Sequence, residues 1–357
     1  MKRFLSLCAP VMALGLTAVA HADSTLASGD GQAVGTRVST MNVTGSGLGA
    51  GGVSPFVVPG WYSYKTIPGT QWVSPLYDPK KSPFSLSATP GQDYTFTQSF
   101  TTSPLGIFQI KGSLVSDNNL LSAYLDTPGN PLANVPVFLP DSRADENGFN
   151  SYRIELPFGP TAGVSGVAGA NHTLVFIVHN QTNNFDYDPM ALDFQASVIQ
   201  PVVHCEVAQS SLWPPNHDLV NVGLGLTTTV KGGTGTSTVT VMVLSNEADQ
   251  PSGAKGDDHF SPDASNQGLD TLRLRAERLG TGSGRVYLII VMAKDTAGNT
   301  GYCTSTVVVP HDQSAASIAA VTLAATNAAA LYELTGNPPA GYVVVGGPGA
   351  PVDGPKQ

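Results

Sequence analysis

The chain has 357 residues, enough for two or three ordinary domains, and only 12% of them are charged, about half the share of roughly 25% in a typical soluble protein. This excludes a charge-rich disordered chain and a coiled coil, while 39 Gly and 27 Pro beside 41% hydrophobic residues indicate strands and turns. With 17 Lys and Arg against 26 Asp and Glu and no basic cluster, we expect no nucleic-acid partner and an acidic, extracellular type of surface.

Residues 1–22 are predicted to form a secretory signal peptide. Lys2 and Arg3 precede the apolar run Phe4–Ala20, and Ala20-His21-Ala22 supplies the small residues of a cleavage site. We therefore expect an exported protein, extracellular or periplasmic, whose mature chain begins at Asp23.

Residues 23–59 are rich in Gly, Ser, Thr, Ala and Val without a sustained period, which predicts a flexible leader. Gly47–Gly52 formally matches GxGxxG. Dinucleotide binding would need a strand before this motif and a helix after it, and the sequence predicts neither.

Residues 60–200 have the period of two that is typical of half-buried strands. Tyr94, Phe96 and Phe100 share one strand face, and Leu192–Val198 alternates in the same way, with Asp193 facing outward. Leu174–Val178 is apolar on both faces, as a central strand must be. An antiparallel sandwich is predicted, because no amphipathic helix interrupts these strands.

Residues 202–312 are predicted to form a second β-sandwich. The run Val286–Ala293 is nearly all apolar and indicates the central strand. Another strand would place Leu272, Leu274 and Ala276 inward and the charged residues between them, Arg273, Arg275 and Glu277, toward solvent.

Cys205 and Cys303 are the cysteines left after signal-peptide cleavage, and in an oxidising compartment such a pair favours a disulfide. The bond would tie the first strand of the second sandwich to its last. Two free buried thiols are the alternative.

In the tail, residues 313–357, Ser314 is a predicted N-cap for an Ala-rich helix that stops at Gly336-Asn337-Pro338. The Gly/Pro-rich residues from Gly341 onward are predicted to be disordered. The Ala-rich stretch is interrupted by Thr and Asn and is poor in large residues, so we expect no membrane span in the mature chain.

Five motifs of the second domain carry a resemblance to immunoglobulin-like, HYR-type modules of secreted bacterial proteins: Leu212-Trp213-Pro214-Pro215-Asn216-His217, Leu272–Arg278, Gly284-Arg285-Val286-Tyr287, Asp295–Asn299 and Val309-Pro310-His311-Asp312. The resemblance implies a spacer or binding role in an exported bacterial protein and no reaction.

The first domain resembles the jelly-roll, galactose-binding-like sandwiches of exported bacterial proteins. The resemblance rests on Trp61, Trp72-Val73-Ser74-Pro75, the Phe100 strand, Ser116-Asp117-Asn118 and Gly169–Phe176. It implies an all-β fold of two antiparallel sandwiches, jelly-roll-like and then immunoglobulin-like.

A calcium site is one interpretation of the acidic segment between Ser245 and Asp270. Loop carboxylates are the hard oxygen ligands that Ca²⁺ requires, and a neighbouring strand end could add one more. The candidate ligands are Glu247, Asp257, Asp258, Asp263 and Asp295. The EF-hand register is absent, and a solvated acidic loop is the alternative.

Aromatic residues near the start of the first sandwich suggest a sugar-binding face. Trp61, Tyr64 and Trp72 are the candidate ligand-binding residues, provided that their rings are exposed together. Trp213 could stack on a sugar or a partner, but we expect it to pack in the core, with His217 capping its turn.

No GxSxG elbow, HExxH helix or clustered set of histidines marks a catalytic site, so we expect no enzyme. The sequence favours a secreted, non-catalytic binding or adhesion protein whose partner is an extracellular glycan or surface. A secreted carbohydrate-active hydrolase and a structural surface or matrix component are the alternatives.

Overall fold

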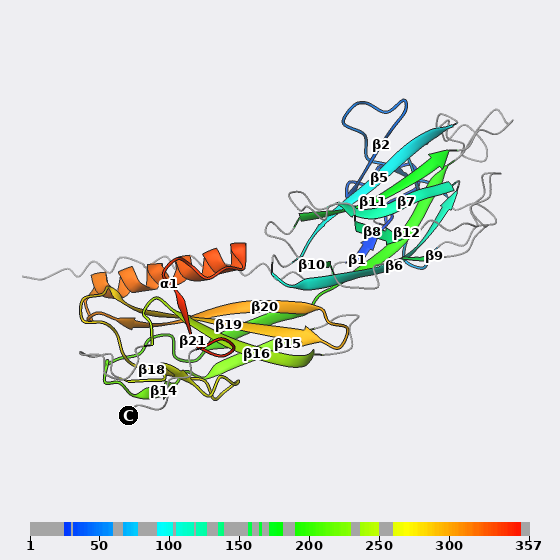
Figure 1. Cartoon of the computed structure of the whole chain (residues 1–357). Helices are drawn as coiled ribbons and strands as arrows, with labels where there is room; N and C mark the ends of the chain where they lie inside the picture. Colours follow the sequence, from blue (N-terminus) through cyan, green and yellow to red (C-terminus); the bar gives the residue numbers. More distant parts are fainter. Residues whose placement is uncertain are drawn as a thin grey trace, which may run out of the picture.

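The computed structural model describes residues 25–29, 31–59, 67–77, 91–102, 105–117, 119–126, 135–138, 156–158, 164–165, 171–180, 190–229, 236–249 and 260–350. These residues form two β-sandwiches joined end to end, with one long helix on the outside of the second (Figure 1). The prediction of an all-β fold with a C-terminal helix is confirmed.

The first sandwich consists of two antiparallel sheets. One sheet has the strand order β2-β5-β11-β7-β8; its strands are β2 (Met41–Gly45), β5 (Gln92–Thr101), β7 (Asn119–Asp126), β8 (Val135–Phe138) and β11 (Asn171–Asn180). The facing sheet is built on β6 (Ile107–Asp117) and β12 (Ala191–Ile199), with short strands around them: β1 (Thr25–Ala27), β3 (Phe56–Val57), β4 (Val73–Ser74), β9 (Leu156–Phe158) and β10 (Val164–Ser165).

The core between these sheets follows the predicted alternation. Phe96, Phe108, Phe176 and Phe194 are fully buried in one apolar cluster. Phe176 of β11 and Phe194 of β12 meet across the sandwich with their ring centroids 4.6 Å apart. The period of two therefore identified the inward faces of these strands correctly.

The leader, residues 23–59, is not flexible in its described part, and that prediction is wrong. β1 pairs with β12, β2 pairs with β5, and Val38, Met41, Val43 and Val57 are buried in the first core. The strands have only three, five and two residues, so their alternation is too short to stand out from the Gly- and Ser-rich composition.

Asp193 is buried, although the alternation of β12 predicted that it faces solvent. Its carboxylate accepts hydrogen bonds from Ser28 Oγ at 2.9 Å, from the backbone N–H of Ile67 at 3.0 Å and from the Thr70 hydroxyl. These bonds attach two loops to β12, and they compensate for the burial of a charged group.

The second sandwich places a layer of four strands, β21-β16-β19-β20, against two small sheets. This layer continues the sheet of β6 and β12, because Thr300 of β20 pairs with Ile107 of β6. The layer contains β16 (Thr236–Ser245), β19 (Gly284–Asp295), β20 (Thr300–Pro310) and β21 (Val343–Gly346). The small sheets contain β13 (Val202–Val207) with β15 (Leu224–Thr229), and β14 (Leu219–Asn221) with β18 (Arg273–Arg275) and β17 (Ala264–Ser265). β19 lies between β16 and β20, as predicted for a central strand.

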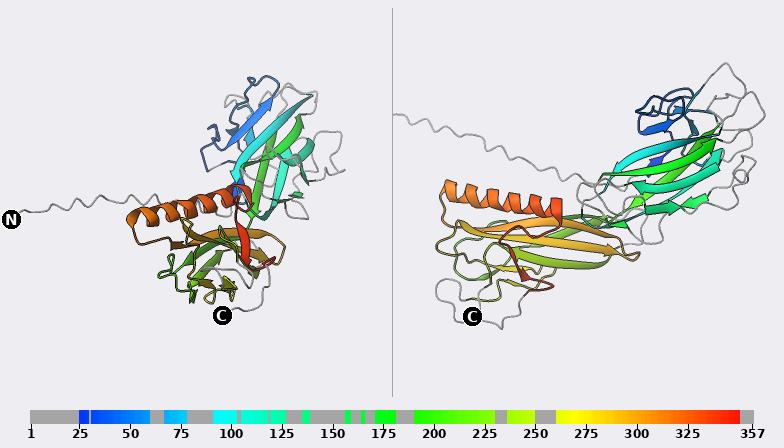
Figure 2. Two further views of the ribbon diagram at one scale, coloured as in Figure 1. Left: turned by 60° about the vertical axis from the view of Figure 1, so that its left-hand side comes forward. Right: turned by 45° about the horizontal axis from the view of Figure 1, so that its top comes forward.

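Helix α1 (Ala315–Thr335) covers the outer face of this layer (Figure 2). The Ser314 side chain caps its first turn and Gly336 ends it with φ 68°, as predicted. Val321, Ala325, Ala328 and Tyr332 form its buried face. Within the described residues, α1 is the helix long and apolar enough to cross a membrane; here it lies on the sheet.

The segment that follows α1 was predicted to be disordered from Gly341, and this is wrong for residues 341–350. β21 adds to the edge of the layer by pairing Val344 with Leu244 of β16. Val345 is buried in the second core.

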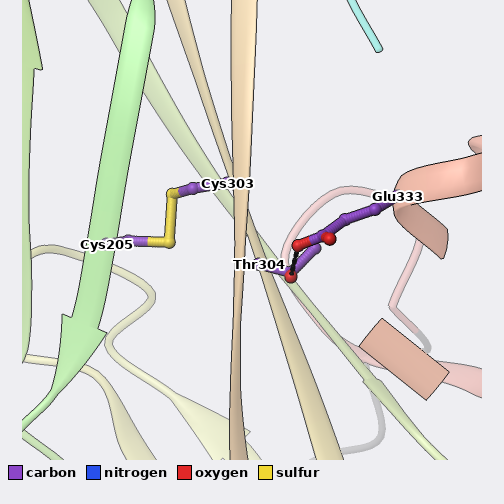
Figure 3. Close-up of a disulfide and its surroundings, with 4 residues drawn as sticks. All are labelled: Cys205, Cys303, Thr304 and Glu333. Atoms are coloured by element: carbon purple, nitrogen blue, oxygen red, sulfur yellow. Dashed lines mark hydrogen bonds between the residues drawn. A yellow bond between two sulfur atoms is a disulfide. The ribbon is translucent and has the colours of Figure 1, made fainter. Parts of the chain in front are cut away.

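The disulfide between Cys205 and Cys303 is present, which confirms the prediction (Figure 3). It joins β13 to β20 across the sandwich, with 5.9 Å between the two Cα atoms. The next residue, Thr304, points to the opposite side of β20 and donates a hydrogen bond of 2.5 Å to Glu333 of α1. One strand therefore connects the disulfide and the helix.

Candidate functional site

The side chain of Trp213 is the large aromatic group that this fold presents to solvent from the second sandwich. It is 45% exposed, so the expectation of core packing is wrong. The preceding Leu212 is fully buried, and its N–H donates to the carbonyl of Val308 at 2.9 Å, which attaches the loop to β20. The indole therefore projects from an anchored point of the backbone.

The rest of this loop is held equally firmly. Pro214 and Pro215 each fix φ and lack a backbone donor. Beyond them, the N–H of His217 donates to the carbonyl of Ala276 at 2.9 Å, and the N–H of Ala276 donates to the carbonyl of Asp218 at 2.8 Å. We call the segment from Leu212 to Asp218 the Trp213 loop.

His217 adopts a backbone φ of 70°, a left-handed conformation that is unfavourable for a residue with a Cβ. Two side-chain contacts hold it there. Nδ1 lies 2.9 Å from Glu277 Oε2, and the imidazole ring packs on Phe260 with 4.3 Å between the centroids. Strain that the surroundings maintain in this way is typical of functional loops.

Beneath the Trp213 loop lies a buried ionic cluster centred on Arg285, which has no exposed surface. Arg285 Nε donates to Glu247 Oε2 at 2.9 Å, and Nη1 donates to Asp263 Oδ2 at 2.6 Å. Nη2 lies 3.6 Å from Glu277 Oε1. Three acids from three different connections therefore converge on one guanidinium.

Arg275 connects this cluster to the Trp213 loop. Its guanidinium donates to the carbonyl of His217 at 2.6 Å and to the carbonyl of Pro262 at 2.9 Å. Glu247 Oε2 also accepts from the N–H of Leu279 at 2.9 Å. The cluster thus fixes the backbone on which the loop rests.

Burial is the largest influence on the pKa values of two acids in the cluster, Asp263 and Glu277. It raises the pKa of Asp263 to about 7; Arg285 opposes the rise and the nearby Asp249 adds to it. Burial also raises the pKa of Glu277, although His217 and Arg285 favour its ionised form. These carboxylates serve as internal partners for arginine, because water does not solvate them.

The three predicted calcium ligands that the structure describes, Glu247, Asp263 and Asp295, do not form one group. Glu247 and Asp263 meet, but through Arg285. Asp295 lies at the other end of β19, on the order of 35 Å away at about 3.4 Å per residue, so its predicted approach to this site is wrong. There it accepts from the N–H groups of Ala297 and Asn299, which closes the β19–β20 turn.

Asp257 and Asp258 lie outside the described residues. Among the residues that the structure does describe, no three or more His, Cys, Asp or Glu side chains form a group that could hold a metal ion. The calcium expectation therefore stays a prediction.

The predicted aromatic face of the first sandwich fails at Trp72. This side chain is 1% exposed and packs in a small apolar cluster with Val58, Ile67 and Val115, so it cannot contact a ligand. Trp61 and Tyr64 lie outside the described residues. Of the two tryptophans among the described residues, Trp213 is the exposed one.

Comparisons with known proteins leave the family open. No protein-family model matches the chain, and no curated protein matches its sequence. Two solved structures of glycosyl hydrolase family 2 members from Bacteroides cellulosilyticus are similar at 10% and 11% identity, with TM-scores of 0.23 and 0.20. They match 75% and 74% of this chain, which spans about a third of their lengths, 34% and 35%. Likeness at this level carries no argument about function.

Proposed function

We propose that the chain is a secreted, non-catalytic binding protein for an extracellular glycan, and that Trp213 makes the central contact. The exposed indole on the anchored Trp213 loop is the observation that carries this proposal. An indole offers a flat apolar face and one N–H donor, which suits the C–H face of a sugar ring. The contact thus lies on the second sandwich.

The state of the loop favours binding. Because the bonds to Val308 and Ala276 fix the backbone before a ligand arrives, little conformational entropy is lost on association. The chain carries a net charge of -9, which repels polyanions. A neutral polysaccharide is therefore the preferred class of ligand.

The resemblance to immunoglobulin-like, HYR-type modules supports the same role. Three residues of the site belong to the motifs that carry this resemblance. Trp213 is the exposed contact, and Glu277 and Arg285 lie in the buried cluster that supports it. The module would act as a disulfide-tied unit that presents the Trp213 loop.

Hydrolysis of a glycan is the second candidate function. The burial of the clustered carboxyl groups argues against it and for binding. A glycosidase needs two carboxyl groups that flank a sugar in an accessible cleft. Glu247, Asp263 and Glu277 are close together but buried around Arg285, where a polymer cannot reach them.

A panel of insoluble neutral polysaccharides tests the proposal. We expect the exported chain to be depleted from solution by at least one polysaccharide while no reducing ends appear in the supernatant. Release of reducing sugar would establish a hydrolase. Self-assembly without depletion would favour a structural component of the cell surface or matrix.

A further inference from the structure

We propose that two copies of this chain associate through the outer faces of their α1 helices, which pack side by side in antiparallel directions. The partner on this face is therefore a second copy of the chain. The inference is independent of the glycan proposal, because the Trp213 loop takes no part in the contact.

Helix α1 is apolar around its whole circumference. Glu333 is the only charged residue among its 21 residues, and Ala, Leu, Val and Ile make up most of the others. A helix that is apolar on all sides is normally buried on all sides. In α1, only Val321, Ala325, Ala328 and Tyr332 are buried against the sheet. The opposite face therefore lacks the cover that its composition requires.

The outer face of α1 carries a group of exposed leucines. Leu323, Leu331 and Leu334 are 61%, 43% and 58% exposed, and no other described element exposes as many large apolar side chains. At about 100° per residue, the three lie within about 80° of one another around the helix. Single exposed apolar residues are normal on a protein surface, whereas a contiguous group marks an interaction site.

The spacing of the outer face is that of a helix–helix seam. Six exposed positions follow one another at intervals of four and three residues: Ala316, Ala320, Leu323, Asn327, Ala330 and Leu334. This is the heptad spacing with which one helix packs along another. The small Ala side chains let two helices approach closely, and the Leu side chains fill the space between them. We call these six positions the α1 seam.

The α1 seam is complementary to itself when two helices run in opposite directions. A twofold axis at its midpoint, residue 325, matches each Leu of one copy with a smaller side chain of the other. The pairs are Leu334 with Ala316, Leu323 with Asn327, and Ala330 with Ala320. Large side chains opposite small ones interdigitate without clashes, and a twofold contact between identical surfaces closes as a dimer.

Polar groups on α1 do not oppose the contact. The Thr326 hydroxyl donates to the carbonyl of Thr322 at 3.0 Å. The Glu333 carboxylate accepts from Thr304 and is held beside β20 (Figure 3). These groups keep their hydrogen bonds when water leaves the α1 seam, so little polar desolvation is left uncompensated.

Charge favours a second copy over a lipid surface. Helices that lie on lipid surfaces typically carry Lys and Arg toward anionic headgroups. α1 contains neither residue, and the whole chain has 26 Asp and Glu against 17 Lys and Arg. Anionic lipids would repel such a chain. A second α1 instead offers an uncharged face and brings no carboxylate into the seam.

The position of the first sandwich favours antiparallel helices. It lies beyond the C-terminal end of α1, where Leu105 packs against the cluster of Ala328 and Tyr332. It also rises on the side of the second sandwich that carries α1 (Figures 1 and 2). Parallel helices would direct both first sandwiches into the same space, whereas antiparallel helices place them at opposite ends of the dimer.

Analytical ultracentrifugation of the exported chain tests the dimer. Contact along one helix is smaller than the standard interface of about 800 Å² per partner, so we expect a weak dimer with Kd on the order of 10–100 µM. Concentrations below and above this range should show a monomer that converts to a dimer. A monomer at every concentration would overturn the proposal.

Two variants test whether α1 makes the contact. Leu323→Asp places a carboxylate from each copy beside the twofold axis and should raise Kd about tenfold or more. The variant should remain folded, because Leu323 is 61% exposed. Leu121→Asp, at a 42% exposed leucine on β7 of the first sandwich, is the matched control and should dimerise as wild type does. Equal Kd values for wild type and Leu323→Asp would overturn the assignment to α1.

Cysteine cross-linking tests the direction of the helices. Mild oxidation of the double variant Ala320→Cys, Ala330→Cys should link two copies, because these positions face each other in the antiparallel seam. Ala330→Cys alone should not link, since it faces Ala320 of the other copy. Efficient linkage of the single variant would show parallel helices and overturn the assigned direction.

Vesicles of phosphatidylcholine, with and without phosphatidylglycerol, test lipid as the alternative partner. We expect the exported chain to stay in solution with both. Flotation of wild type but not of Leu323→Asp would make lipid the partner of α1 and overturn the proposal. Leu323→Asp should still bind the polysaccharide at concentrations where the chain is monomeric, so failure of the dimer and failure of the glycan proposal are distinguishable.

Discussion

Replacing Arg285 with methionine should lower the free energy of unfolding of the second sandwich by about 3–5 kcal/mol, the range for breaking a buried ion pair by removing one partner. Methionine fills a similar length, but it leaves Glu247, Asp263 and Glu277 buried without their shared guanidinium. The loss should be smaller at pH 5 than at pH 8, because burial raises the pKa of Asp263 to about 7 and also raises that of Glu277, so protonation at the lower pH removes part of the stranded charge.

Urea unfolding of wild type and variant at both pH values measures this effect. Arg273→Gln is the matched control, since Arg273 lies on β18 beside the cluster but is exposed. It should change the stability by no more than about 0.5 kcal/mol. Equal urea midpoints for wild type and Arg285→Met would show that the cluster does not support the fold.

Removal of the disulfide should have an effect of similar size. The disulfide joins two positions that are 98 residues apart, so it closes a long loop in the unfolded chain. The double variant Cys205→Ser, Cys303→Ser lacks this loop, and its unfolded chain therefore has more conformational entropy. The chain-entropy model predicts a loss of about 4–5 kcal/mol for a loop of this length. Because this approaches the whole stability of a marginal domain, the second sandwich should be the first part to unfold.

Urea unfolding with and without a reductant provides the check. The reductant should shift the midpoint of wild type toward that of the double variant and leave the double variant unchanged. Two thiols that are freely alkylated in the unreduced, denatured chain would contradict the bond itself.

The period of two was a reliable guide where strands are long and one face is apolar. β5, β12 and β19 were placed correctly because nine to twelve residues carry the signal. β1, β2 and β21 were missed, since three to five residues in a Gly-rich context cannot show a period. Tertiary pairing with longer strands forms these elements.

The same alternation misplaced the charged residues of the candidate site. Between Leu272 and Arg278 it predicted solvent-facing positions for Arg273, Arg275 and Glu277, and only Arg273 is exposed. Their partners are distant in the sequence: Glu277 lies 3.6 Å from Arg285 of β19, and Arg275 lies 3.8 Å from Asp263 of the segment before β17. One feature of the sequence could have predicted this cluster: Arg285 stands at the start of the apolar run Val286–Ala293, and the acid-rich segment Ser245–Asp270 could supply its buried partners.

The expected positions of the two described tryptophans were also wrong: Trp72, expected at the surface, is buried, and Trp213, expected in the core, is exposed. Trp72 precedes β4, and it packs in an apolar cluster that includes Val115 and Ala191 of the distant strands β6 and β12. Trp213 precedes two prolines, which cannot donate to a strand ladder, so its loop leaves the sheet. Local composition alone does not decide between these outcomes.

Binding of Trp213→Ala to the polysaccharide that retains wild type is the most direct test of the proposed contact. Removal of the indole takes away the ring on which the sugar is proposed to stack, so binding should weaken at least tenfold. The melting temperature should not change, because the side chain of Trp213 is 45% exposed in the folded chain. Leu323→Ala, which removes an exposed apolar side chain from α1, is the control and should bind as wild type does. Equal affinity of wild type and Trp213→Ala would contradict the account.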